Sequence, residues 1–415
     1  MKISKFEIII ISIALVLSII ESISFAFAIR IVGQNALNAR LWQYIIVALL
    51  LVSDKSLLNK KSMIILYVYS LVYFVLEYVG HYDLQSDRVS RYVWMYYQHF
   101  SLGLCILLRE YVLNRKSNQV KGTIVNVIIL SYMIAFILNI IAVLANPYAV
   151  RGFVSKANGL TSQSYRSQGL AGYGFASSVP FIIPIAVYKL KRAKGASNYL
   201  RRIFWILFIS IAIVSSYLSV YIAPLILSVV LLFLALLGRR RLRVNSVVVV
   251  VLLIAYVVTP KGIIGDLLRD TGVKLNNFEI ERKFEDLAEV VEGGMVIEEG
   301  IATANSIEGR ASRIDLNINR FFKSPLIGQG TSSEGEHIYW LNLLAQYGVI
   351  GTVPLLMLII YSWRRDFSYL SDDYKFFYFL SIFGFIALGF MKAVQGVHMF
   401  MIPFLLAPII SEDVL

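Results

Sequence analysis

The chain has 415 residues, of which 58% are hydrophobic and only 16% charged, and its formal net charge is +13. A soluble domain of this length could bury a large core with fewer apolar residues, and here these residues come in long runs. The composition therefore predicts an all-α membrane protein, because a backbone in lipid must form its hydrogen bonds within each element. The positive charge is concentrated in short segments between the runs, which indicates membrane orientation and argues against a nucleic-acid partner.

About twelve stretches are candidate membrane-spanning helices, because crossing the hydrocarbon takes roughly 20 apolar residues. The first is too long for a signal peptide and has no clear cleavage site of small residues after it, so we expect it to be retained. A break is expected near Ser215–Ala223, where serines and Pro224 interrupt the apolar run between two basic clusters. In chain order the candidates are 6–29, 38–53, 62–80, 91–112, 123–145, 173–189, 203–217, 220–237, 245–259, 337–362, 376–391 and 393–410.

Short basic segments alternate along the chain in a way that predicts its orientation. With the N-terminus in the cytoplasm, just over half of the 39 Lys and Arg residues fall in the short inner segments. We therefore expect a polytopic protein with both termini in the cytoplasm and two long loops outside. Its predicted parts are helices one to five in 1–145, a first outer loop in 146–172, helices six to nine in 173–259, a large outer loop in 260–336 and helices ten to twelve in 337–415.

The large outer loop is predicted to be partly helical. Asn277–Val291 has apolar residues at helical spacing, and Ser306–Lys323 places Ile314, Ile318 and either Phe321 or Phe322 on one face before Pro325 ends the helix. On this pattern alone, the loop would be a small folded cap lying on the membrane surface. It contains more acidic than basic residues, so its arginines do not indicate a diffuse attraction to anionic lipid.

Two arginine-containing clusters in the outer loops could bind an anion. Tyr165, Arg166 and Gly169 begin a glycine-rich segment before a hydrophobic helix, where backbone N–H groups can approach phosphate oxygens that also suit the arginine fork. The alternative is a flexible loop whose arginine marks the membrane interface. Arg310 and Arg313 are three residues apart and share a face of the predicted helix, where the alternative is a solvated face paired with nearby acids.

A third cluster leads into the tenth candidate span. Gly328 and Gly330 form a glycine-rich turn, Glu334 and Glu336 follow it, and His337 stands at the start of the span on the outer side. A neutral imidazole there can accept a proton from a sugar hydroxyl, because histidine changes its charge near neutral pH. The alternative is that this histidine is an amphipathic anchor at the interface.

Charged residues within or near the candidate spans are expected to snorkel towards water, because most of them lie near span ends. These residues are Glu21, Glu77, Arg109, Glu110 and Lys392. Neither a metal nor another cofactor is predicted, since the single cysteine Cys105 has no thiol partner and the histidines lack metal-ligand spacing. The four histidines are His81, His99, His337 and His398.

In this order and topology, the three clusters resemble the Wzy-type O-antigen and capsular polysaccharide polymerases, which share a fold with the O-antigen ligases. Arg166-Ser-Gln-Gly-Leu is similar to the family's Arg-x-x-Gly segment ahead of a helix. From Arg310 onwards, the chain is similar to the family's succession of an arginine, a Pro-Leu-x-Gly-x-Gly turn at 325–330, a histidine at His337 and a Gly-hydrophobic-hydrophobic-Gly segment at 348–351.

The resemblance implies a GT-C-like, metal-independent glycosyltransferase of the bacterial inner membrane that acts on undecaprenyl-pyrophosphate-linked oligosaccharide at the outer face. Arg166 and Arg310 would hold the pyrophosphate of the donor chain, and His337 would act as base on the acceptor hydroxyl. The other residues assigned to substrate binding would be Tyr165, Gly169, Arg313, Gly328, Gly330, Glu334 and Glu336. The implied partners are the lipid-linked sugar, the bilayer, and flippase and chain-length regulator proteins.

The sequence departs from the family pattern at two points. Arg310 has the better spacing to Gly328, but Arg313 follows Ser312 as in some members, so both remain candidates for the second arginine. The ligases usually carry a Ser-Arg pair near the seventh and eighth spans, and the segment 215–219 has no arginine, which favours a polymerase. The alternatives are a ligase that transfers polymer to lipid A-core and a flippase or transporter of lipid-linked oligosaccharide.

Overall fold

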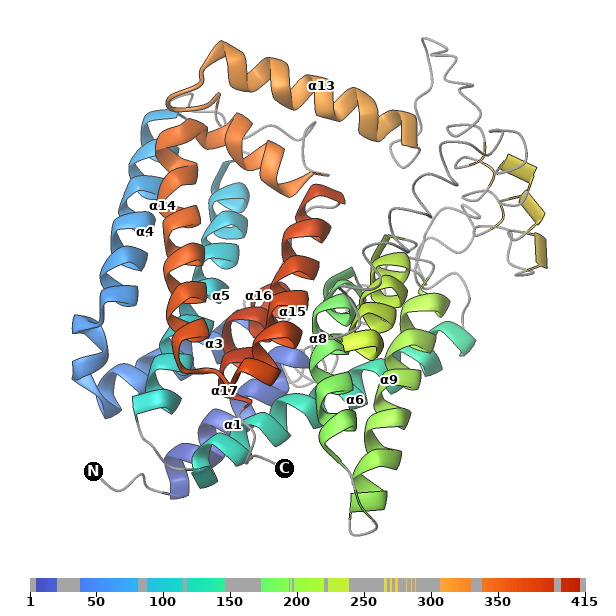
Figure 1. The fold of residues 1–415 in the computed structure, drawn as a ribbon. Coiled ribbons are helices and arrows are strands. Elements are labelled where there is room, and N and C mark those ends of the chain that lie inside the picture. Colours follow the sequence, from blue (N-terminus) through green and yellow to red (C-terminus); the bar gives the residue numbers. More distant parts are fainter. Residues whose placement is uncertain are drawn as a thin grey trace. The chain divides into compact units, whose positions relative to one another are not determined.

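In the computed structural model, the described part of the chain is helical (Figure 1). The structure describes residues 5–20, 38–80, 88–114, 118–145, 173–193, 195, 198–219, 223–238, 307–329, 338–391 and 397–410, together with isolated positions between 265 and 288. The predicted span at 245–259 and the predicted helix at 277–291 lie wholly or mostly outside these residues.

The helices occupy the remaining predicted stretches, with the first of them described as far as Ile20. They are α1 (Lys5–Ile19), α3 (Asn38–Ser53), η1 (Lys55–Asn59), α4 (Lys61–Gly80), α5 (Arg88–Asn114), α6 (Asn118–Ala145), α8 (Tyr173–Arg192), α9 (Tyr199–Leu218), a helix at Ala223–Gly238, α13 (Ile307–Lys323), α14 (Tyr339–Tyr369), α15 (Asp372–Met391), α16 (Val397–Met401), η4 (Ile402–Leu406) and α17 (Ala407–Ile409).

Within the described residues, four helices are long and apolar enough to cross a membrane: α6, α9, α14 and α15. Shorter apolar helices lie at Glu7–Ile19, Lys61–Leu76, Ala223–Gly238 and His398–Ile409. The described part of the chain is therefore all-helical, and its helices are suited to a lipid bilayer.

The chain divides into two compact units. The first comprises Met1–Leu232, Ile350–Leu388 and Val394–Leu415, and the second comprises Phe233–Val349 and Gly389–Ala393. Helix α13 and the first part of α14 thus belong to the second unit. Most of the predicted spanning helices belong to the first.

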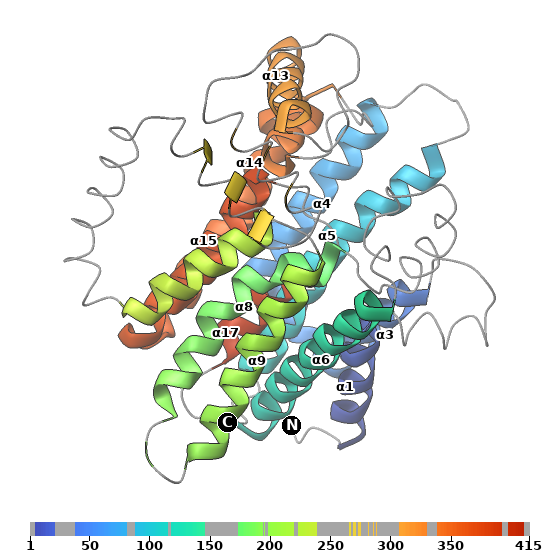
Figure 2. The same ribbon diagram turned by 90° about the vertical axis from the view of Figure 1, so that its right-hand side faces the viewer.

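In the first unit, α8 and the C-terminal segment form the core. From Ala176 to Lys189 nearly every side chain of α8 is buried, and so is the whole of 398–410. Helix α8 packs on α9 and α16. Helix α6 packs on α1 and α9 (Figure 2). A helix that is apolar all round and buried needs other helices on every side, which is what this position provides.

The outer helices of the first unit present apolar side chains to their surroundings. On α6, Leu130, Ile134 and Ile141 are exposed along one stripe, and α4 does the same with Ile64, Val68 and Leu71. Water would disfavour such contiguous apolar stripes. They therefore support lipid as the surrounding medium of these helices.

A polar contact within the apolar interior joins α6 to α9. The Asn139 side-chain amide donates to Ser215 Oγ at 2.8 Å and to Ser219 Oγ at 2.7 Å, and Ser219 Oγ in turn donates to the Ser215 carbonyl at 2.7 Å. All three residues are fully buried. These bonds fix the register of the two helices beside the break predicted at 215–223, and α9 ends at Leu218 within that break.

We expect Asn139→Ala to lower the stability of the protein in detergent by about 1 kcal/mol, because interhelical hydrogen bonds in membranes contribute roughly that much. Thermal unfolding followed by circular dichroism measures the change. Ile141→Ala is the control on the same helix, because Ile141 is exposed. Equal effects of the two substitutions would contradict a role for the Asn139 contacts.

Candidate functional site

A short turn after α13 is fastened to a break in α14 by backbone hydrogen bonds. The Gln329 N–H donates to the Ala345 carbonyl at 2.9 Å, and the Val349 N–H donates to the Pro325 carbonyl at 2.9 Å. Within the turn, the Gly328 N–H donates to the Ser324 carbonyl at 2.9 Å. We call the contact between 324–329 and 345–349 the glycine clamp.

Two glycines make this close approach possible. Gly328 has φ +75°, and a Cβ on it would lie 2.1 Å from the Gln346 carbonyl oxygen. Gly348 has φ 59° and ψ −164°, which splits α14 into 339–347 and 349–369, and its Cβ would lie 2.4 Å from the Leu326 carbonyl carbon. A positive φ favours glycine, and the φ/ψ combination of Gly348 is essentially restricted to glycine. Both positions belong to the glycine pattern identified in the sequence.

Helix α13 leads into the clamp and carries both candidate arginines of the large outer loop. By helical spacing, the backbone positions of Arg310 and Arg313 share a face with Asn317 and Arg320, which are buried side chains at 1% and 8% exposure. The inward face of this helix is therefore polar. Helix α13 ends at Lys323, just before Pro325 as predicted.

The start of α14 is held by aromatic packing. Ile338, Tyr339 and Trp340 are buried, and the Tyr339 and Trp340 ring centroids are 4.8 Å apart. A Cβ on Gly389 would lie 2.2 Å from Trp340 Nε1, so this glycine lets the indole lie against the backbone of α15. The residues that immediately follow His337 are thus firmly packed.

Most of the predicted site residues lie outside the described residues, and their assignments stay predictions. Gly328 alone is described in full, and the backbone of Arg310 and Arg313 is described as part of α13. The predicted residues beyond the described part are Tyr165, Arg166, Gly169, Gly330, Glu334, Glu336 and His337.

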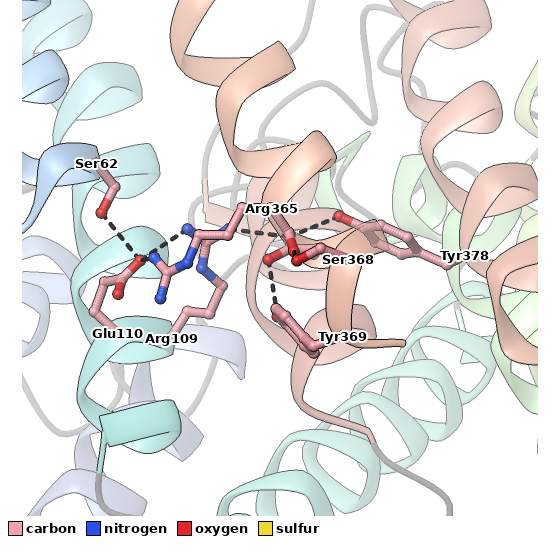
Figure 3. A network of polar contacts seen from close by, with 8 residues as sticks. Ser62, Arg109, Glu110, Arg365, Ser368, Tyr369 and Tyr378 are labelled. Atoms are coloured by element: carbon pink, nitrogen blue, oxygen red, sulfur yellow. Dashed lines mark hydrogen bonds and ion pairs between the residues drawn. The ribbon is translucent and has the colours of Figure 1, made fainter. Parts of the chain in front are cut away.

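In the first unit, a cluster of charged side chains joins four helices (Figure 3). Arg109 of α5 donates to Asp366 of α14 and to the neighbouring Glu110, both at 3.0 Å, and Arg365 also pairs with Glu110. Three hydroxyls complete the cluster: Ser62 donates to Glu110 at 3.0 Å, and Tyr369 and Tyr378 each donate to Asp366 at 2.8 Å.

The expectation that Arg109 and Glu110 snorkel towards water is wrong. Both side chains are fully buried, as is Asp366. A buried charge is costly unless it is paired and hydrogen-bonded, and here two guanidinium groups face two carboxylates, so the formal charges cancel. Sequence reasoning missed the cluster, although the adjacent Arg-Glu pair in an apolar helix was a signal for it.

Within the described residues, no group of three or more His, Cys, Asp and Glu side chains could hold a metal ion. Cys105 is buried and carries a free thiol. A scan against protein-family models and searches of curated proteins and of solved structures found nothing that matches this chain.

We expect Gly348→Ala to lower the stability of the protein by about 3 kcal/mol or more, because backbone strain and overpacking each cost roughly 1–3 kcal/mol. Gly195→Ala is the matched control, since Gly195 also has a positive φ of +91° but no atom within 4 Å of its Cβ position. The Gly195→Ala variant therefore has backbone strain but no steric collision of the new Cβ. Thermal unfolding in detergent compares them, and equal losses would mean that the clamp contact contributes nothing.

We expect Asp366→Asn to destabilise the protein by about 3–5 kcal/mol, because it leaves excess positive charge in a buried site. The double substitution Arg109→Gln with Asp366→Asn keeps the cluster neutral and should recover part of the loss. The control is Asp372→Asn in the exposed Lys375–Asp372 pair, where the cost is at most about 1 kcal/mol. Yield and thermal unfolding in detergent are the measurements, and an Asp366→Asn variant as stable as the control would refute a role for the buried charge.

Proposed function

We propose that this protein is a polysaccharide polymerase of the bacterial inner membrane, which joins undecaprenyl-pyrophosphate-linked repeat units at the outer face. The observation that supports the resemblance best is the glycine clamp. It ties the end of the helix carrying Arg310 and Arg313 to α14, the helix that His337 precedes. Gly328 and Gly348, two glycines of the family-like pattern, are the residues that permit the contact.

The proposed reaction forms one glycosidic bond and breaks one bond to phosphate. A hydroxyl of the acceptor repeat unit attacks the anomeric carbon of the donor chain, while His337 takes the hydroxyl proton. The bond between the anomeric carbon and the pyrophosphate oxygen breaks, and undecaprenyl pyrophosphate leaves with the electron pair. The growing chain is thereby transferred to the acceptor lipid.

The arginines would act on the leaving group. Negative charge develops on the pyrophosphate as the bond breaks, and cations held in place at a low-dielectric boundary stabilise it without reorganising. Arginine keeps its charge there and binds phosphate oxygens through two parallel hydrogen bonds. Arg166 and Arg310 are proposed for this role, with Arg313 as the other candidate in α13.

The local packing around the first turn of α14 suits a general base at His337. A base must be held within hydrogen-bond reach of the proton it removes, and small misplacements reduce catalysis strongly. Trp340 against Gly389 and the glycine clamp restrain this part of the chain on two sides. His337 is joined directly to this restrained segment.

The proposal includes a membrane arrangement. About twelve spans in a GT-C-like bundle would place both termini in the cytoplasm and the loops 146–172 and 260–336 on the outer side. The lipid tail of the substrate would remain in the bilayer while its sugars meet the loops. Flippase and chain-length regulator proteins would supply substrate and set product length, and neither a metal nor another cofactor would take part.

We expect His337→Ala to reduce polymer formation by about 100-fold or more, because loss of a general base typically costs that much. Purified protein in liposomes with lipid-linked repeat units provides the assay, and a gel profile of the products gives chain length. His81→Ala is the control, because His81 is predicted to lie on the same outer side. Circular dichroism and detergent extraction confirm that the variant inserts and folds.

Four outcomes would contradict the proposal or part of it. Normal chain lengths from His337→Ala would remove His337 from the mechanism. Long polymer in a gene deletion strain would eliminate the polymerase assignment, and full-length polymer that is not attached to lipid A-core would indicate a ligase. Movement of the lipid-linked sugar across the membrane without new glycosidic bonds would indicate a transporter.

A further inference from the structure

Helix α13 has the reverse of the polarity expected for a helix on a water-soluble surface. Its inward face holds Asn317 and Arg320, which are 1% and 8% exposed. Its outward face holds Ile314, Ile318 and Phe322, spaced four residues apart, and Phe322 is 72% exposed. An amphipathic helix in water turns its apolar stripe inwards. Something other than water is therefore expected on the outer side of this stripe.

The apolar surface continues beyond the helix into the glycine clamp. Leu326, in the turn, is 64% exposed, and the neighbouring Ile327 is also exposed. Val349, which is exposed as well, donates its N–H to the carbonyl of Pro325 in this turn. We call Ile314, Ile318, Phe322, Leu326, Ile327 and Val349 the apolar strip.

The part of α14 that follows Val349 also exposes apolar side chains. The exposed residues that follow Val349 at helical spacing are Val353, Met357 and Ile360. Helix α14 is long and apolar enough to cross a membrane, so in a bilayer these side chains would contact lipid.

The remaining exposed positions of α13 are suited to the boundary between lipid and water. Beside the apolar stripe lie three exposed polar residues, Asp315, Asn319 and Lys323. Helices that lie in a membrane interface combine one apolar side with an adjoining charged or polar side, and they often contain phenylalanine and basic residues. Figure 1 shows α13 as a single uninterrupted helix.

We propose that α13 is an interfacial helix, and that the apolar strip is inserted among the lipids of the outer leaflet. Its inward polar face, with the positions of Arg310 and Arg313, would then be held at the level of the lipid headgroups. This inference goes beyond the proposed enzymatic activity and does not depend on it. It identifies the occupant of the strip as lipid, as opposed to a second copy of the chain or another protein.

The test places a fluorescent label on either side of α13. Cys105→Ala removes the only cysteine, and Phe322→Cys or Asn319→Cys then provides one site for a bimane label. The purified protein is reconstituted at one copy per nanodisc, with or without spin-labelled lipid. We expect spin-labelled lipid to quench the label at 322 at least about twofold more than the label at 319, and aqueous iodide to show the opposite order.

Two outcomes would overturn the inference. If iodide quenches both labels equally and spin-labelled lipid does not quench the label at 322, the strip faces water. That result would mean that a protein partner, and not lipid, is needed to cover the strip. Disulfide-linked dimers of unlabelled Phe322→Cys in the native membrane would identify a second copy as the occupant. Ile318→Cys reports on the same stripe if Phe322→Cys does not fold. Neither measurement involves glycosyl transfer, so failure here leaves the polymerase proposal to its own test.

Discussion

A helix in hydrocarbon has no water to satisfy polar side chains, so each polar group that enters the interior must find its partner within the protein. The cluster around Arg109 follows this constraint, because its guanidinium bridges Glu110 and Asp366 and the formal charges cancel. The Asn139 contacts follow it with neutral groups. Polar contacts of this kind specify which apolar helices lie side by side, which apolar contacts alone do weakly in lipid.

The glycine clamp satisfies backbone hydrogen-bonding groups in the same way as the clusters satisfy polar side chains. Where α14 breaks at Gly348, its freed N–H and C=O groups are bonded by the turn after α13 instead of by the helix itself. The break is thereby part of a hydrogen-bonded junction between α13 and α14. This junction connects the segment carrying the candidate arginines to the segment that follows the candidate base, which is why glycines at these positions bear on the proposed chemistry.

The exposed surface of the protein indicates more than one surrounding medium. On α4 and α6 the apolar stripes face outwards, as expected of helices in lipid. Helix α13 combines an apolar stripe with adjoining polar residues that are also exposed, which suits the boundary between lipid and water. A lipid-linked sugar requires such a boundary, since its tail is soluble in hydrocarbon and its pyrophosphate is not.

Local patterns in the sequence determined where helices begin and end. Helix α9 ends within the predicted break at 215–223, and α13 ends before Pro325. The tertiary structure decided how polar groups are satisfied. Asp366 is 257 positions from Arg109 in the chain. The position of Arg109 near the end of a predicted span gave no sign of this partner. It also showed that Gly328 and Gly348 are required for backbone packing, whereas the pattern alone indicated a glycine-rich turn at Gly328 and a family-like segment at Gly348. Helix formation depends on neighbours within a few residues, while the environment of a charge or a glycine is set by segments that only folding brings together.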